Sequence, residues 1–184
     1  MTILHVDSSI QGDTSVSRAL SRAAVSHLAG LHPALAIVRR DLVAAPLAHF
    51  TAAEGADAAV LDEFLAARIV VVGAPMYNFG IPSQLKSWLD RLAVPGRSFR
   101  YGPQGPEGLC GGRTVLLVST RGGVFSDGSP RAEMDHQEGH LRAFFGFLGV
   151  ADVRIIRAEG LALGEAAQQA ALQAAHDTIR QLAA

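Results

Sequence analysis

The sequence predicts an α/β domain built on a parallel five-stranded sheet with helices on both faces. Stretches of strand character alternate five times with stretches of helix character along the 184 residues. The central strand candidates, residues 69–72 and 114–118, are continuous runs of aliphatic residues, as is typical of strands buried on both faces. No repeat or linker interrupts the alternation, so we expect one domain over residues 1–184.

The first half of the chain contains two strands and two helices in this pattern. Residues 2–6 predict a buried first strand, and residues 34–39 predict the second. Between them, residues 15–31 have helical spacing, with Ser15 as the expected N-cap. A second helix is expected up to about residue 67, because residues 51–54 have the spacing of a capping box.

The second half continues the pattern with three more strands and three helices. The strands are expected at residues 69–72, 114–118 and 153–156, and the helices at residues 83–94, 132–148 and 165–182. Right-handed crossovers leave few arrangements for such a chain. We therefore predict a flavodoxin-like three-layer sandwich with strand order 2-1-3-4-5.

One long segment, residues 97–112, does not fit the alternation. It contains five glycines and two prolines and is too long to be a simple connection. We expect it to be a functional loop or a segment that packs on a partner.

Composition excludes several classes of protein. The formal net charge of −1 argues against binding to nucleic acid or to an anionic membrane, since both need clustered basic residues. A single cysteine, Cys110, excludes an intrachain disulfide and fits a reducing cytoplasm. Neither a signal peptide nor an apolar run approaching the ~20 residues of a membrane span is evident, so we expect a cytoplasmic location.

The segment 74–82, Ala-Pro-Met-Tyr-Asn-Phe-Gly-Ile-Pro, follows the third predicted strand. In an open α/β sheet, ligands bind at the edge where the strands end. Prolines stiffen the segment at both ends. Between them, Tyr77, Asn78 and Phe79 could face a flat heteroaromatic ring. The alternative is a rigid surface turn whose two aromatic side chains pack into the core.

Two further loops are expected at the same edge of the sheet. The loop after the first strand contains Ser9, Ser15 and Ser17 and runs into a helix, whose N-terminus could bind a phosphate monoester. The alternative is simple N-capping. After the fourth strand, Gly122 and Gly123 could bring backbone N–H groups close to a ligand that gains negative charge, although a flexible turn explains them equally well.

Taken together, these motifs resemble the FMN-dependent NADH azoreductases, bacterial homologues of the NAD(P)H quinone reductases. The most specific part of the resemblance is the block Met76-Tyr77-Asn78-Phe79, and the similarity runs over nearly the whole chain. The resemblance implies that Ser9, Ser15, Val16 and Ser17 bind the phosphate of FMN. It implies that the flavin ring contacts Met76, Tyr77, Asn78 and Phe79 and also Thr120, Arg121, Gly122 and Gly123.

The same resemblance implies a homodimer with FMN sites at the interface. Phe99, Tyr101, Phe125 and Phe147 are then expected on the substrate side. NADH or NADPH would reduce the flavin, and a quinone or azo compound would reoxidise it in a ping-pong reaction without a catalytic nucleophile or base. The segment 47–62 is shorter than in longer members of the family, and Phe125 stands where some members have a polar ring. Both differences concern the substrate range.

Two other functions are compatible with the same fold. A flavodoxin-like electron carrier without its own turnover is the main alternative, although carriers are usually strongly acidic. A flavin-free binding protein that kept the fold is the second. We expect no metal site, because His136 and His140 lack the glutamate of the zinc-protease pattern and have no evident third ligand.

Overall fold

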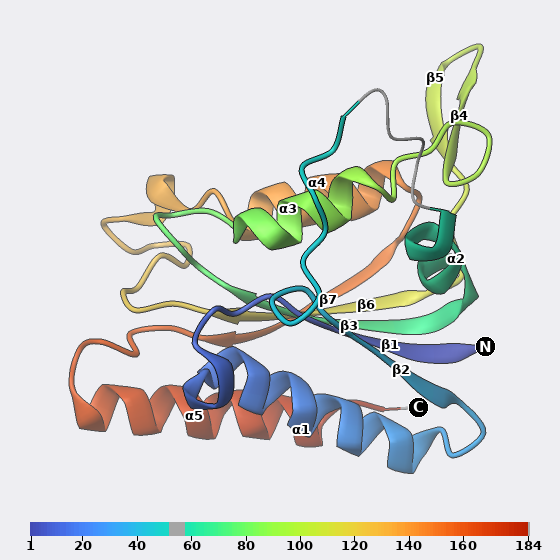
Figure 1. The fold of residues 1–184 in the computed structure, drawn as a ribbon. Coiled ribbons are helices and arrows are strands. Elements are labelled where there is room, and N and C mark those ends of the chain that lie inside the picture. Colours follow the sequence, from blue (N-terminus) through green and yellow to red (C-terminus); the bar gives the residue numbers. More distant parts are fainter. Residues whose placement is uncertain (52–57, 184) are drawn as a thin grey trace.

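Five parallel strands form the middle layer of the protein in a computed structural model that describes residues 1–51 and 58–183 (Figure 1). The strands are β1 (Thr2–Asp7), β2 (Ala36–Asp41), β3 (Ala67–Pro75), β6 (Thr114–Thr120) and β7 (Asp152–Ala158). Their order in the sheet is β2-β1-β3-β6-β7, and every neighbouring pair is parallel. The predicted five-stranded parallel sheet is confirmed. Its labels differ from the predicted order 2-1-3-4-5 because two more strands precede β6 in the chain.

Helices cover both faces of this sheet. Figure 1 shows α1 (Val16–Leu31) and α5 (Glu165–Arg180) on one face, and α3 (Ser83–Asp90) and α4 (Glu138–Phe147) on the other. The helix α2 (Ala58–Ala66) packs on the second face together with α3 and α4. None of the helices in the described ranges combines the length and apolarity needed to cross a membrane.

The protein has two apolar clusters, one on each face of the sheet, and the alternation of side chains along β3 explains how one strand contributes to both. Val70 and Val72 lie in one apolar cluster with Trp88 of α3, whereas Ile69 and Val71 lie in a second cluster with residues of α1 and α5. Successive side chains of a strand point to opposite faces, so a continuous aliphatic run supplies both clusters at once. The sequence pattern had predicted this burial.

The segment 97–112 is not a plain loop. It forms an antiparallel hairpin of β4 (Phe99–Gly102) and β5 (Gly105–Gly108). The hairpin packs on the end of α4, where a Cβ atom at Gly108 would lie 2.1 Å from the backbone nitrogen of Gly149. Only glycine allows this approach. In Figure 1 the hairpin projects at the end of the molecule where the parallel strands begin.

Several predicted boundaries were wrong. The helix predicted at residues 132–148 is a 3₁₀ turn, Ala132–Met134, followed by α4 from Glu138 onward. The carboxylate of Asp135 accepts hydrogen bonds from the backbone of Gln137 and Glu138 and so delays the start of the helix. The helix α3 ends at Asp90 rather than residue 94. Most of the predicted capping box at residues 51–54 lies outside the described residues.

Candidate functional site

Loops from the ends of β1, β3, β6 and β7 converge at one edge of the sheet and enclose a pocket of about 320 Å³. We call it the loop pocket. It is lined by Gln11, Thr14, Ser15, Val16, Ser17, Pro75, Met76, Tyr77, Thr120, Arg121, Gly122, Leu161, Ala162 and Gln168. Eight of the twelve residues predicted to bind a cofactor are among them, whereas Ser9, Asn78, Phe79 and Gly123 are not.

The start of α1 forms one wall of the loop pocket. Ser15 is the N-cap, and its hydroxyl oxygen accepts a hydrogen bond from the backbone of Arg18 at 3.3 Å. The N–H groups of Val16 and Ser17 find no acceptor in the part of the chain that the structure describes. Unpaired N–H groups and the helix dipole together favour an anion at this position.

Ser9 joins two loops behind this wall. Its buried hydroxyl lies 3.1 Å from the phenolic oxygen of Tyr77, which also accepts a hydrogen bond from the backbone of Ile10. The carbonyl of Ser9 accepts two hydrogen bonds from Arg18, at 3.1 and 3.0 Å. The structure therefore gives Ser9 a role in shaping the loop rather than a place on the pocket surface.

Arg18, which is buried, in turn forms a partly buried ion pair. Its two terminal nitrogens lie 2.5 and 2.8 Å from the carboxylate oxygens of Asp41, at the end of β2. The hydrogen bonds from Arg18 hold the pKa of Asp41 well below its ordinary value. This pair anchors the serine-containing loop to the sheet.

The turn at residues 77–80 is strained. Tyr77 and Gly80 exchange backbone hydrogen bonds, and the two residues between them have positive φ angles, 48° at Asn78 and 72° at Phe79. A bulky residue rarely adopts this conformation. The backbone carbonyl of Phe79 accepts a hydrogen bond from His136, and its ring meets Phe125 edge-on at 6.0 Å. The surrounding structure therefore holds an unfavourable backbone in place.

The loop after β6 presents backbone rather than side chains. The N–H groups of Gly122 and Gly123 have no acceptor within residues 1–51 and 58–183. The side chain of Arg121 is fully buried and is held by carboxylates, including Asp135 at 2.7 Å and Glu138 at 2.6 Å. A ligand in the loop pocket could therefore meet the backbone of Arg121 but not its guanidinium group.

Three of the predicted substrate-side residues lie elsewhere. Phe99, Tyr101 and Phe147 form a cluster on the hairpin and α4, which we call the hairpin aromatics. Figure 1 shows the hairpin and the loops that follow the parallel strands at opposite ends of the molecule. A single chain therefore does not bring the hairpin aromatics to the loop pocket. The fourth residue, Phe125, lies beside Phe79 at the loop-pocket end.

One side of the loop pocket was not predicted from the sequence. Leu161, Ala162 and Gln168 come from the loop after β7 and the first turns of α5. This loop contains Gly160 and Gly164, both with positive φ angles. Since β7 is parallel to β6, the loop that follows it had to lie at the same edge as the others.

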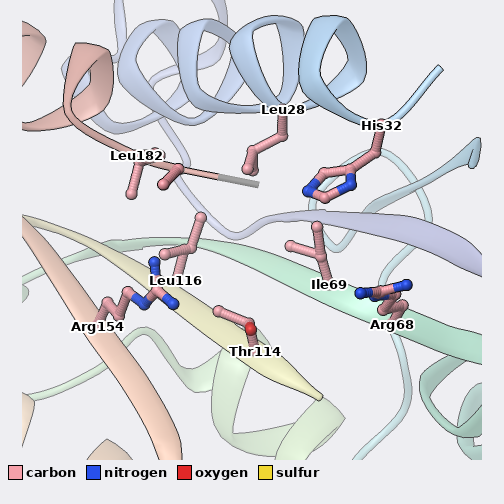
Figure 2. A pocket seen from close by; sticks show the side chains of 9 residues that line it. Leu28, His32, Arg68, Ile69, Thr114, Leu116, Arg154 and Leu182 are labelled. Carbon is pink, nitrogen blue, oxygen red and sulfur yellow. The ribbon is translucent and has the colours of Figure 1, made fainter. Parts of the chain in front are cut away.

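A second pocket of about 130 Å³ lies at the opposite edge of the sheet, where β3 and β6 begin (Figure 2). Leu28 of α1 and His32, which follows the helix, point into it from one side, and Arg68, Thr114 and Arg154 approach from the sheet. Arg154 is held by Asp152 in a two-point ion pair. None of the residues predicted to be functional lines this pocket.

No cluster of three or more His, Cys, Asp or Glu side chains suited to a metal ion occurs among the described residues. His136 precedes α4 and therefore does not share a helix with His140. The helix predicted at residues 132–148 would have contained both histidines, so this part of the prediction was wrong.

Comparison with known proteins gives consistent results. A family model described as a flavodoxin-like fold matches residues 1–183. An FMN-dependent NADH:quinone oxidoreductase from Bradyrhizobium sp. is 50% identical over an alignment of 201 positions. One from Methylocella silvestris is 51% identical over an alignment of 203 positions. Both alignments cover 100% of this chain and 100% of the relative.

Solved structures agree with the fold. The azoreductase AzrA superposes with a TM-score of 0.86 at 27% identity, covering 99% of this chain and 100% of AzrA. An FMN-dependent NADH-azoreductase from Bacillus anthracis, solved in complex with FMN, gives a TM-score of 0.86 with full coverage of both chains. Its identity of 22% makes this second likeness one of fold alone.

Proposed function

This chain belongs to the family of FMN-dependent NADH:quinone oxidoreductases with a flavodoxin-like fold, and we propose that it uses FMN to carry two electrons from NAD(P)H to a quinone or an azo compound. The observation that carries the proposal is the loop pocket. It joins a helix start with free N–H groups to Tyr77, at the beginning of the strained turn, and to a second turn with free N–H groups. These are the features that a phosphorylated, flat heteroaromatic cofactor requires.

The start of α1 fits the phosphate of FMN. The free N–H groups of Val16 and Ser17 would donate to its oxygens, and the hydroxyls of Ser15 and Ser17, 3.0 Å apart, would add donors. Because no lysine stands in this loop, the phosphate would be held by the helix dipole and by neutral donors.

The other walls fit the flavin ring. Met76 and Tyr77 line the pocket from the β3 side, and Gly122 lines it from the β6 side. The free N–H groups of Gly122 and Gly123 would stabilise the negative charge that a flavin gains on reduction. When bound, FMN supplies the ping-pong redox chemistry, and the protein supplies binding, orientation and electrostatics.

A homodimer would complete the site. The hairpin aromatics lie away from the loop pocket of their own chain, and Tyr101 is 76% exposed. A second copy of the chain could place this ring on the substrate side of its neighbour's flavin. The proposal gives the exposed tyrosine a role that a single chain does not provide. The remaining predicted substrate-side residue, Phe125, lies in the same chain as the pocket.

We also propose a cytoplasmic location. Cys110 is a free, buried thiol whose pKa is raised by burial, so it is an unreactive structural residue. Quinones, azo compounds and nicotinamide cofactors are small molecules, so the proposal needs neither nucleic acid nor a membrane as partner.

The test begins with the absorbance spectrum of the purified protein, followed by addition of FMN and then of NADH with a quinone. We expect a yellow protein that oxidises NADH only when an acceptor is present. Uptake of FMN without turnover would favour an electron carrier. Failure to bind added FMN would favour a flavin-free protein and would overturn the proposal.

A further inference from the structure

Arg121 is a fully buried cation beside the loop pocket, where the resemblance had implied a direct flavin contact. Its Nε donates hydrogen bonds to the hydroxyl of Ser119 at 3.1 Å and to the side-chain oxygen of Gln137 at 3.0 Å. Its Nη2 donates to Asp135 at 2.7 Å. With no exposed surface, this guanidinium acts on its protein neighbours.

The partners of Arg121 belong to different walls of the loop pocket. The amide nitrogen of Gln137 donates to the carbonyl of Ala74 at 2.6 Å, immediately before the segment that carries the strained turn. Glu159, 3.6 Å from Nη1, belongs to the loop after β7 and accepts a hydrogen bond from the backbone of Phe125 at 3.0 Å. One guanidinium thus connects the loops that follow β3, β6 and β7.

The backbone of the same residue completes these connections. The N–H of Arg121 donates to Ala158 at 2.9 Å, and its carbonyl accepts from Leu161 at 3.1 Å. The carbonyls of Gly122 and Gly123 also accept hydrogen bonds from the loop after β7, each at 2.9 Å. Their carbonyls are therefore occupied, whereas their N–H groups are the free donors described above.

Charge in this cluster depends on Arg121. Three carboxylates, those of Asp135, Glu138 and Glu159, surround it, and Glu138 also pairs with Arg157 at 2.7 and 2.9 Å. Without Arg121, these three carboxylates would lose the guanidinium that lies between them. Their repulsion would separate the loops, and their field would oppose any further negative charge in the adjacent pocket.

We propose that Arg121 is a positioning residue for the flavin, which fixes the Gly122–Gly123 turn and sets the reduction potential of the cofactor from behind the pocket wall. The inference rests on the proposed function, because it requires FMN to occupy the loop pocket. It differs from direct binding in that Arg121 acts through the loops and through its charge.

The test compares Arg121→Gln and Arg121→Lys with a control, Arg154→Gln, which removes an exposed ion pair at the opposite edge of the sheet. FMN affinity is measured by quenching of flavin fluorescence, and the potential of the bound flavin by redox titration. We expect Arg121→Gln to weaken FMN binding about tenfold or more, because the turn is no longer held. The control should bind FMN as the unchanged protein does.

The reduction potential of the bound flavin distinguishes a positioning role of Arg121 from a purely structural role. We expect Arg121→Gln to weaken binding of the reduced flavin about tenfold more than binding of the oxidised form, which lowers the two-electron potential by about 30 mV. Arg121→Lys keeps the positive charge but not the planar set of N–H donors. The reduction potential of its bound flavin should therefore be close to that of the unchanged protein, whereas its FMN affinity should lie between those of Arg121→Gln and the unchanged protein. Unchanged affinity, or a loss of affinity with an unchanged potential, would overturn the proposal.

A second variant keeps the test decisive if Arg121→Gln does not fold. Glu159→Gln removes one anion from the same cluster, so the potential should shift in the opposite direction, upward. An unchanged potential in Glu159→Gln would then count against the inference. If the unchanged protein takes up no FMN, the proposed function itself fails, and this result is distinct from either outcome with the variants.

Discussion

Phe79 shows how a single residue is held in an unfavourable conformation at the candidate site. A two-residue turn with both φ angles positive favours Asn-Gly, and here the second position is a phenylalanine. Left-handed backbone at such a residue costs about 1 kcal/mol or more. Backbone strain of this kind is concentrated at functional sites, so we infer that the phenylalanine side chain has a role at the proposed site.

The first prediction concerns this strain. Phe79→Gly should leave the free energy of unfolding within about 1 kcal/mol of its original value, because relief of strain offsets the loss of a ring that is 41% exposed. The same variant should bind FMN more weakly or turn over quinones more slowly. Urea unfolding and steady-state kinetics test the two parts. A large loss of stability with normal turnover would contradict this interpretation.

The second prediction concerns Asp41, whose pKa is lowered chiefly by its hydrogen bonds from Arg18. A depressed carboxylate pKa stabilises the folded state above the ordinary value of 3.8, and this stabilisation is lost as the pH falls below it. Asp41→Asn should therefore lower stability at pH 7 by up to about 3 kcal/mol, since it removes the carboxylate that accepts two hydrogen bonds from the buried Arg18 and leaves only Asp7, 3.9 Å away, to offset its charge. It should also flatten the decline of stability between about pH 5 and pH 2.

Urea unfolding at several pH values measures both effects. The matched control is Asp90→Asn, which removes the partner of Lys86 at the surface and should cost less than about 1 kcal/mol. Parallel pH profiles for Asp41→Asn and the unchanged protein would contradict the assignment.

Sequence reasoning found most residues of the candidate site but not what their side chains contact. Ser9 and Arg121 were both expected to touch the cofactor, yet Ser9 bonds to Tyr77 and Arg121 to a cluster of carboxylates. These partners lie up to 68 positions away in the chain. Motifs place a residue at a strand end, whereas the direction of its side chain depends on contacts between distant loops.

At the scale of elements, the first turn of α1 has two roles that can be separated. Ser15 caps the helix, and the same turn presents the donors proposed for phosphate. Aspartate caps helices as well as serine does, whereas alanine does not. Ser15→Asp should therefore preserve stability better than Ser15→Ala does, whereas Ser15→Ala should preserve anion binding better than Ser15→Asp does.

The third prediction uses this difference. Ser15→Ala should lower the free energy of unfolding of the apoprotein by about 1 kcal/mol, and Ser15→Asp should keep it close to the original value. FMN affinity should follow the reverse order, because the aspartate repels the phosphate. Riboflavin, which has no phosphate, is the control ligand and should not be weakened by the added charge. Equal FMN affinity in both variants would contradict the proposal that the phosphate binds at this position.

The elements that sequence predicted least well are those defined by contacts between distant segments. The positions of β3 and β6 could be predicted from aliphatic runs, because a strand that is buried on both faces consists mostly of aliphatic residues. The hairpin at residues 99–108 has no comparable sequence pattern. Its Gly108 is needed for a close contact with Gly149, which is distant in the sequence. The start of α4 depends in the same way on one local carboxylate, Asp135.

At the scale of the whole molecule, the two groups of predicted residues lie at opposite ends. The loop pocket is lined by loops that follow the parallel strands, and the hairpin aromatics belong to the hairpin and the end of α4. Figure 1 shows the hairpin at the end of the molecule where the parallel strands begin. Tyr101 is too exposed to serve the core of its own chain. A dimer in which each hairpin reaches the other copy's pocket unites the two groups, and its mass would be twice the 19.3 kDa of the chain.

The last prediction tests whether two chains share each site. Tyr101→Ala should keep stability and FMN affinity but lower kcat/KM for a quinone, because it changes only the exposed ring. Gly122→Val should fold, since a Cβ atom there lies 3.5 Å from Ala162, but should obstruct the pocket. When the two variants are mixed and allowed to exchange subunits, each mixed dimer regains one site with an intact pocket and an intact hairpin. Activity should then rise to about a quarter of that of the unchanged protein, because half of the dimers are mixed. If each site were built within one chain, mixing would give only the average of the two variants.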